Sequence, residues 1–329
     1  MTQNLITDVH GLKVGHAGDA KLGSGTTVVI FDKPVIASID VRGGGPGTRD
    51  TALLDPAQTV EGIDAIVLSG GSAFGLDAAS GVQAYLREQG RGFKVGDARV
   101  PIVPGAVLFD LMSGGNKKWG RYPPYRELGY KATKAAISDC ALGSVGAGLG
   151  ATTVNLKGGI GSASAKTTGG ITVGAIVAVN AVGSVTVGDS PHFWAAPFEQ
   201  GNEFGGYGLP SHFGADALEM RAKGGPGQST TLAIIATDAK LTKAQCHRLA
   251  VMAQTGMARA IYPVHTPLDG DVIFAAAVGD KKLSDPVYSL TELGTVAANV
   301  LARAIARGVY SAKALNFPVA LASWQDWHG

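Results

Sequence analysis

The segment GGPGQSTTLAIIATD, residues 224–238, passes within a few positions from a Gly/Pro-rich loop into an apolar run. Glycine and proline favour turns, whereas threonine and the apolar residues after it have high strand propensity. One interpretation is a loop that leads into a buried strand. The other is that the chain cleaves itself here, so that a threonine becomes a new amino terminus and a nucleophile. The rest of the sequence bears on this choice.

Composition sets the broad class of the protein. The chain has 329 residues, of which 45% are hydrophobic, enough for a sizeable core. The formal net charge is only +2 and no block of Lys or Arg occurs, so we expect no nucleic-acid partner. The first residues lack a basic and apolar leader, and no apolar run is long enough to span a membrane. We therefore expect a cytoplasmic protein without a membrane partner.

Cysteine and histidine placement gives no sign of a metal or cofactor. The two cysteines, Cys140 and Cys246, are too few for a disulfide framework, and we expect both to be core thiols. No His, Cys or Asp cluster has metal-ligand spacing, and the seven histidines are scattered, which argues against a Ser-His-Asp triad. We predict that the protein uses no metal and no cofactor.

Periodicity predicts an α/β fold with many strands. The strand signals cover 25–31, 34–43, 64–71, 230–237 and 271–278, with a short turn at 32–34 and glycine-punctuated antiparallel strands within 143–187. Helical patterns cover 73–90, 129–141, 242–260 and 289–312, with Thr242 and Ser289 as N-caps. Residues 188–227 form a long segment with weak periodicity. Because runs of strands separate the strand-to-helix units, a sheet sandwich covered by helices fits better than alternating βαβ, and residues 1–329 are expected to form one domain.

Two glycine motifs allow other interpretations. LSGGSAFG, residues 68–75, follows a strand and precedes a helix, so its backbone N–H groups are able to face a nucleotide phosphate. It lacks the lysine of a Walker loop and the G-x-G-x-x-G spacing. Ser72 in this motif has a setting like that of a nucleophile elbow, but the G-x-S-x-G pattern is not met. In DVRGGGPGTRD, residues 40–50, no helix pattern follows, and structural turns are the simpler interpretation of both motifs.

Eight collinear motifs resemble one family. They are GLKVGHA, DVRGGGPGTRD, LSGGSAFGLDAASGV, VPIVPGAVLFDL, LKGGIGSAS, VAVNAVGSV, STTLAIIATDAKLT and HTPLDGDVIFAAAV, spread from about residue 9 to about residue 310. Together they resemble the L-aminopeptidase/D-esterase (DmpA) family of self-cleaving hydrolases, which includes β-aminopeptidases and the endo-type 6-aminohexanoate (nylon) oligomer hydrolase. The resemblance implies an αββα sandwich like that of N-terminal-nucleophile hydrolases. It also implies self-cleavage into an α and a β chain, and a homotetramer-like assembly of these pairs.

The resemblance places the cleavage point. Thr230 stands where the nylon-oligomer branch has its nucleophilic threonine, so cleavage is expected between Ser229 and Thr230, giving an α chain of residues 1–229 and a β chain of residues 230–329. Serine is also a nucleophile of this type, and a cut between Gln228 and Ser229 remains an alternative. Gly224, Gly225 and Gly227 are expected to give the loop the conformational freedom that cleavage needs.

Four further residues correspond to the family's active site. Asp269 and Asp271 match an acidic pair of the nylon-oligomer branch, and Lys157 and Asn180 match the family's lysine and asparagine. From this we expect Asn180 to donate to a tetrahedral oxyanion and Lys157 to keep the nucleophile's amine neutral. The two aspartates would orient the ammonium and hydroxyl groups. Without the resemblance, a D-G-D turn, a capped bulge and a solvated lysine are the simpler interpretations.

One position departs from the family pattern. Phe109 stands where members of this family carry a tyrosine that assists at the active site, so one hydrogen-bond donor is missing. We expect Phe109 to line the substrate pocket, together with the aromatic residues Phe193, Trp194 and Phe198.

Two classes of function follow. In the first, the freed α-amino group of Thr230 acts as the base for its own hydroxyl, and the protein is an aminopeptidase or amidase that acts on small peptides or 6-aminohexanoate oligomers. In the second, the chain is an uncleaved, non-catalytic relative that binds a small ligand.

Overall fold

The computed structural model describes residues 3–223 and 229–329. The strands are β1 Leu12–Asp19, β2 Ser24–Val41, β3 Gly47–Arg49, β4 Ile63–Ser69, β5 Phe93–Val95, β6 Ala98–Val100, β7 Gly105–Val107, β8 Ile160–Lys166, β9 Thr172–Ala178, β10 Leu232–Ala239 and β11 Val272–Lys281. The α-helices are α1 Ala78–Glu88, α2 Tyr125–Lys134, α3 Lys243–Ala258, α4 Tyr288–Tyr310 and α5 Trp324–His328, and short 3₁₀ helices lie at 6–8, 52–54, 72–77, 146–148 and 196–198. None of the helices in these described ranges is long and apolar enough to cross a membrane.

Nine strands of the described residues form one sheet in the hydrogen-bonded order β3-β7-β4-β2-β11-β10-β9-β8, with β1 paired to β2, and β5 and β6 pair only with each other. The long strand β2 belongs to two layers, because it pairs with β1 and β4 through its first half and with β11 through its second half. One layer therefore contains β1, β4, β7 and β3, and the other contains β11, β10, β9 and β8.

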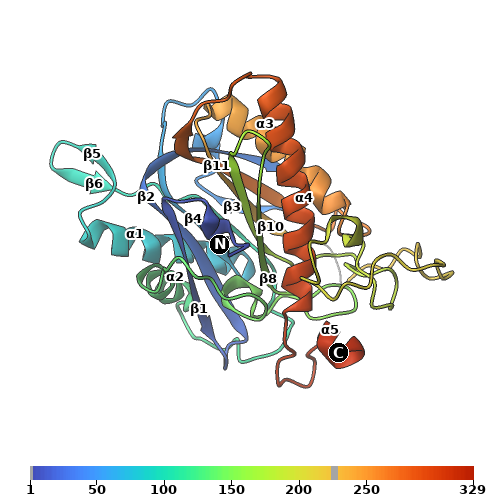
Figure 1. The fold of residues 1–329 in the computed structure, drawn as a ribbon. Coiled ribbons are helices and arrows are strands. Elements are labelled where there is room, and N and C mark those ends of the chain that lie inside the picture. The colour runs from blue at the N-terminus through green and yellow to red at the C-terminus, as the bar shows by residue number, and fades with distance from the viewer. Residues whose placement is uncertain (1–2, 224–228) are drawn as a thin grey trace.

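Three hydrophobic clusters separate four layers. Val29 and Phe31 from the first sheet pack against Ile234 and Phe274 from the second in the cluster between the sheets. A second cluster joins the outer face of the first sheet to α1 and α2, and a third joins the outer face of the second sheet to α3 and α4. Figure 1 shows the two helical layers on opposite sides of the strands. This arrangement confirms the predicted αββα sandwich.

The boundaries of several elements differ from the prediction. The expected turn at 32–34 is wrong, because β2 is continuous from Ser24 to Val41 and these exposed residues mark a register irregularity where the strand passes from one sheet to the other. The helix predicted over 129–141 instead covers Tyr125–Lys134. It ends there because Ile137 exchanges backbone hydrogen bonds with Val14 of β1.

The predicted helix caps differ in outcome. Thr242 is the N-cap of α3, and its side chain accepts the N–H of Gln245 in a capping box. Ser289 is not the N-cap of α4, because it lies inside the first turn while Asp285 accepts the N–H groups of Val287 and Tyr288. Both cysteines are buried free thiols, as expected.

Candidate active site

Thr230 lies just before β10 and is 3% exposed. Its N–H donates to the Asn180 carbonyl oxygen at 2.8 Å, and its Oγ1 hydroxyl donates to the Ser229 carbonyl oxygen at 2.5 Å. The Ser229 carbonyl also accepts the N–H of Gly270 at 2.9 Å. The hydroxyl therefore contacts the peptide group that precedes it, and a second donor already polarises that carbonyl.

The upstream side of this junction is only partly described. Residues 224–228, which include the predicted Gly224, Gly225 and Gly227 and the alternative cut after Gln228, lie outside the described residues. The Ser229 side chain is buried, and its Oγ has no hydrogen-bond partner within the described part of the chain. Only the threonine hydroxyl of the two is directed at a described carbonyl group.

Asp269 and Asp271 are both buried in a tight turn before β11, and each holds backbone N–H groups. Asp269 accepts the N–H of Val182 at 3.1 Å through Oδ1, and both the N–H and the hydroxyl of Thr266 through Oδ2. Asp271 accepts the N–H of Thr231 at 2.8 Å. Burial, and then the charge of Asp271, raise the pKa of Asp269. Asp271 thus fixes the residue that follows Thr230, and Asp269 fixes Val182 and Thr266 beside it. Neither carboxylate contacts the Thr230 hydroxyl among the described residues.

Asn180 follows β9 and contacts the junction through its backbone and three other groups through its side chain. Its Oδ1 accepts the N–H of Thr152 at 3.0 Å and the Lys223 ammonium at 2.9 Å. Its Nδ2 donates to the Phe109 carbonyl oxygen at 3.1 Å. The amide is consequently fixed in a single orientation beside Thr230.

Lys157 is 1% exposed and lies behind the site. Its Nζ donates to three backbone carbonyl oxygens, those of Gly148 at 2.8 Å, Ala151 at 2.7 Å and Gly158 at 2.6 Å. Burial lowers its pKa to about 7. No hydrogen bond joins it to Thr230 within the described residues, so it holds the loop that leads to Thr152 rather than contacting the nucleophile.

Phe109 reaches the site through its carbonyl group, and its side chain is half-buried. The next residue, Asp110, is fully buried and was missed in the sequence, although it is the last residue but one of the motif VPIVPGAVLFDL. It accepts the hydroxyl of Ser24 at 2.5 Å and the N–H of Gly71 at 2.8 Å. Burial raises the pKa of this carboxyl group.

The Asp110 contact explains the glycine motif at 68–75. The group held at this strand-to-helix turn is the internal carboxyl group of Asp110, which accepts the Gly71 N–H. A Cβ atom on Gly70 would lie 2.2 Å from Asp110 Oδ2. Position 70 therefore requires glycine, because the carboxyl group of Asp110 leaves no room for a side chain. Ser72 has a φ of 52°, but no histidine hydrogen-bonds to it among the described residues.

The second glycine motif, at 40–50, clamps the acidic turn. The N–H of Gly45 donates to the Asp269 carbonyl oxygen at 2.7 Å, and the N–H of Arg42 donates to that of Asp271 at 3.0 Å. A Cβ atom on Gly43 would lie 2.2 Å from the Asp271 nitrogen. Glycine is required here because the two segments approach backbone to backbone.

Sequence reasoning also missed Lys223 and His265. Lys223 donates to Asn180 and Thr152, and burial lowers its pKa to about 7. His265 has a φ of 57°, in the left-handed region, and both its N–H and its Nδ1 contact Asp271 Oδ2. His265 begins the quoted motif HTPLDGD, so its position was visible, whereas nothing near Lys223 in the sequence points to Asn180.

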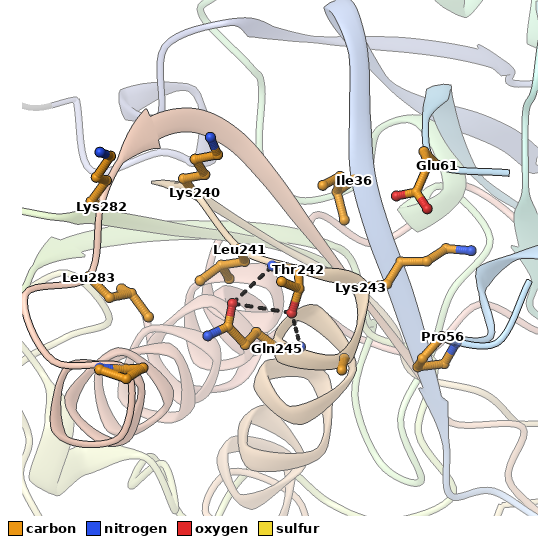
Figure 2. A pocket seen from close by; sticks show the side chains of 12 residues that line it. Ile36, Pro56, Glu61, Lys240, Leu241, Thr242, Lys243, Gln245, Lys282 and Leu283 are labelled. Carbon is orange, nitrogen blue, oxygen red and sulfur yellow. Dashed lines mark hydrogen bonds between the residues drawn. The ribbon is translucent and has the colours of Figure 1, made fainter. Parts of the chain in front are cut away.

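A cavity of about 730 Å³ lies away from this site. Figure 2 shows it at the start of α3, lined by Ile36, Lys240, Leu283 and their neighbours. Lys240 follows the end of β10 while Thr230 precedes its start, and a strand of 8 residues separates the two by about 26 Å. None of the predicted site residues lines this cavity. Across residues 3–223 and 229–329, no three His, Cys, Asp or Glu side chains converge as metal ligands would.

The comparison with protein families agrees with this arrangement. The model of peptidase family S58 matches residues 4–319. This chain belongs to peptidase family S58. The family resemblance predicted from the eight motifs is therefore confirmed, and with it membership of an aminopeptidase and amidase hydrolase family.

The alignments with similar proteins extend over nearly the whole chain. An uncharacterized aminopeptidase of Mycobacterium tuberculosis is 43% identical over 331 residues, which cover 94% of this chain and 94% of that protein. The 6-aminohexanoate-oligomer endohydrolase of Kocuria sp. is 26% identical over 324 residues, which cover 91% and 84%. The structure of an L-aminopeptidase D-Ala-esterase/amidase from Ochrobactrum anthropi, described as a variant of the Ntn hydrolase fold, matches with a TM-score of 0.71 at 20% identity, covering 97% of this chain and 90% of that one. This structural match supports the S58 fold.

Proposed function

We propose that this chain is a self-cleaving amide hydrolase whose nucleophile is Thr230, acting first on its own chain and then on substrate. The observation that carries the proposal is the geometry of the Ser229–Thr230 junction. There the Thr230 hydroxyl contacts the Ser229 carbonyl oxygen, and the Gly270 N–H donates to the same oxygen. A positioned nucleophile and a donor to the developing oxyanion are the two elements that acyl transfer requires.

Self-cleavage would proceed by an N-to-O acyl shift. The Thr230 Oγ1 attacks the carbonyl carbon of Ser229, the hydroxyl proton passes to the Thr230 nitrogen, and the C–N bond breaks to leave an ester. Water then hydrolyses the ester, which gives a Ser229 carboxylate and a free Thr230 with its hydroxyl restored. The Gly270 N–H stabilises the oxyanion of the first step, an interaction whose loss typically costs about 3 to 4 kcal/mol.

The mature site would use the new amino terminus as its base. An α-amino group titrates near pH 7.7 to 8.0, roughly at working pH, so it accepts the proton of its own hydroxyl and returns it to the leaving amine. The Asn180 carbonyl oxygen already accepts the Thr230 N–H and would hold this amine in place. The Asn180 side-chain amide has a second N–H besides the one given to Phe109, and we assign that donor to the oxyanion of the substrate.

The remaining predicted residues would support these groups. Asp271 fixes the N–H of Thr231, and Asp269 fixes Val182 and Thr266 next to Asn180 and the turn. Lys157 would act through the loop at 148–152 and through its positive charge, which opposes protonation of a nearby amine. In these roles Asp269, Asp271 and Lys157 support neighbouring groups and do not contact the Thr230 hydroxyl directly. The hydrogen bonds of each side chain support this assignment.

The two chains would stay together after cleavage. The β chain of residues 230–329 would contain β10 and β11, and these lie between β9 and β2 of the α chain in the hydrogen-bonded order. Separation would require a continuous sheet and the cluster between the two sheets to come apart. We further propose, from the family resemblance, that these α/β pairs assemble into a homotetramer.

The substrate is proposed to be a small amide. The relatives carry the names aminopeptidase and 6-aminohexanoate-oligomer endohydrolase, which supports small peptides and 6-aminohexanoate oligomers as the two substrate classes to test. With Phe109 in place of a tyrosine, the site relies on Gly270 and Asn180 as donors.

The test is intact mass spectrometry of the purified protein with sequencing of its amino termini. The expected result is a second chain that begins at Thr230, and amide hydrolysis by the same preparation. Thr230→Ala should leave one intact chain without activity, whereas Thr231→Ala, a matched control one residue away, should be cleaved. An active preparation that contains only intact chain would overturn the proposal, and a chain that begins at Ser229 would move the nucleophile by one residue.

A further inference from the structure

Lys223 is the last described residue before the 224–228 segment, and its side chain points into the site. Its Nζ donates to the Thr152 carbonyl oxygen at 2.7 Å, to the Thr152 hydroxyl at 3.1 Å and to Asn180 Oδ1 at 2.9 Å. An ammonium group has three donors, and all three are used here. The residue comes from a long segment after β9 whose described part, 179–223, has one short 3₁₀ helix, at 196–198. The side chain of Lys223, together with its backbone N–H, which donates to the Val182 carbonyl oxygen at 3.2 Å, anchors this end.

The contact determines which way the Asn180 amide faces. Oδ1 receives two donors, the Thr152 N–H and the Lys223 ammonium, while Nδ2 faces the Phe109 carbonyl oxygen. A flipped amide would set its NH₂ group against two other donors and its oxygen against a carbonyl oxygen. Every hydrogen bond of the side chain would then be lost, which for buried groups costs about 1 to 3 kcal/mol each.

Asn180 also connects the two described ends of the cleavage region. Lys223 donates to its side chain, and the N–H of Thr230 donates to its backbone carbonyl at 2.8 Å. The charged groups around Lys223 are the carboxylates of Asp269 and Asp110 and the ammonium of Lys157. Asn180 thus accepts hydrogen bonds from the described residues on both sides of 224–228.

We infer that Lys223 is a positioning residue for self-cleavage and hydrolysis, and that it acts by holding the Asn180 amide with Nδ2 toward the reacting carbonyl. The inference rests on the proposed function. A residue that acts only through Asn180 should have no effect once the Asn180 side chain is gone, and this distinguishes it from a lysine that merely stabilises the fold.

A matched control lies two residues away. Arg221 is in the same segment but forms surface ion pairs, with Asp189 at 2.7 Å and Asp216 at 3.4 Å. Arg221→Met removes a charge of the same sign from the same stretch without touching Asn180, so we expect cleavage and turnover like those of the wild type.

The experiment is a double-mutant cycle on the full-length chain. Lys223→Met, which keeps the length of the side chain without its donors, is combined with Asn180→Ala, and the rate of self-cleavage is followed by denaturing gel and mass spectrometry. With Asn180 intact, Lys223→Met should slow cleavage roughly tenfold, whereas in the Asn180→Ala background it should change the residual rate by less than about twofold. In processed enzyme, kcat on a 6-aminohexanoate oligomer or an amino-acid amide, whichever the wild type hydrolyses, should fall with little change in KM.

The outcomes separate the two proposals. Additive effects of the two substitutions, or a Lys223→Met enzyme as fast as wild type, would overturn the role of Lys223 while the proposed function stands. A wild-type chain that stays intact would overturn the proposed function, and the role of Lys223 with it. Should Lys223→Met not fold, Lys223→Gln keeps a shorter donor, and its smaller rate deficit must likewise vanish when Asn180 is replaced.

Discussion

The charged side chains of the Arg303 cluster and those of the site around Asn180 are both largely buried, but their hydrogen-bond partners differ. In the Arg303 cluster, formed by Asn4, Glu203, Arg303 and Arg307, the Arg303 guanidinium contacts Glu203 through Nε at 2.5 Å and Nη2 at 2.9 Å. In the site around Asn180, the ammonium groups of Lys157 and Lys223 contact only neutral oxygen atoms among the described residues.

The pKa values follow this difference. Burial alone would raise the pKa of Glu203, but the hydrogen bonds and charge of Arg303 outweigh burial, so its pKa lies below the usual value. Burial lowers the pKa of both Lys157 and Lys223 to about 7. Direct ion pairing with Arg303 therefore keeps Glu203 ionised at neutral pH. Lys157 and Lys223 have only neutral acceptors, so their protonation changes near neutral pH.

The largest expected effect is on the paired cluster. Arg303→Met leaves the Glu203 carboxylate buried without its partner and should lower the free energy of unfolding by about 3 to 5 kcal/mol. The measurement is urea denaturation in the Thr230→Ala background, in which the chain is expected to stay in one piece. The control is Lys131→Met, which removes an exposed ion pair with Glu127 (side chains 62% and 63% exposed) and should cost less than about 1 kcal/mol. Equal losses in the two variants would show that burial does not distinguish these pairs.

The unpaired lysines should make stability depend on pH in the neutral to alkaline range, whereas Glu203 should do so in the acidic range. Between pH 7, near the folded-state pKa of Lys157, and about 10.4, the pKa expected when unfolded, the unfolded chain binds more protons at this residue. The free energy of unfolding of the wild type should therefore rise relative to Lys157→Met as pH increases, by at most about 1.4 kcal/mol per pH unit. The pKa of Glu203 is also lowered in the folded protein, so its contribution to stability rises with pH as well, but in the acidic range: it is present at neutral pH and is lost on acidification through the lowered pKa.

This dependence is measured as the difference between the unfolding curves of the two proteins, again in the Thr230→Ala background, at several pH values from 7 to about 10. Lys131→Met serves as the exposed reference, for which the difference from wild type should stay level over the same interval. A level difference for Lys157→Met as well would mean that the buried lysine keeps its ordinary pKa.

The sequence predicted the layers of the fold better than the polar contacts of the site. The apolar runs that became β4, β10 and β11 are buried on both faces, and the cap at Thr242 follows a local rule. The turn predicted at 32–34 failed because local turn chemistry does not reveal a strand that passes between two sheets.

Site contacts that join distant segments had no local signal. The contact between Lys223 and Asn180 joins residues 43 positions apart, and the one between Asp110 and Ser24 spans 86 positions. The resemblance to a family indicated Asn180 and the aspartates. Their individual hydrogen bonds, and the reason for glycine at 43 and 70, depend on packing that no window of the sequence contains.

The smallest expected effect concerns close packing at the nucleophile. A Cβ atom on Gly270 would lie 2.6 Å from Thr230 Oγ1 and 2.7 Å from the Gly45 carbonyl oxygen, and both distances are shorter than carbon–oxygen contacts allow. Gly270→Ala should therefore displace either the Thr230 hydroxyl or the backbone of Gly45. We expect self-cleavage to slow by about tenfold, equivalent to about 1.4 kcal/mol in the activation free energy. The time course of chain conversion on a denaturing gel measures this rate.

The control for Gly270→Ala is Gly169→Ala. In that turn between β8 and β9 an added Cβ would meet only Thr167 Oγ1, at 3.8 Å, so conversion should keep the wild-type rate. Because Gly270 also donates its N–H to the Ser229 carbonyl oxygen, and alanine retains that donor, a slower rate would report the position of the hydroxyl rather than loss of the oxyanion donor. Unchanged cleavage in Gly270→Ala would instead mean that the Thr230 hydroxyl reacts from a position other than the one it occupies beside Gly270.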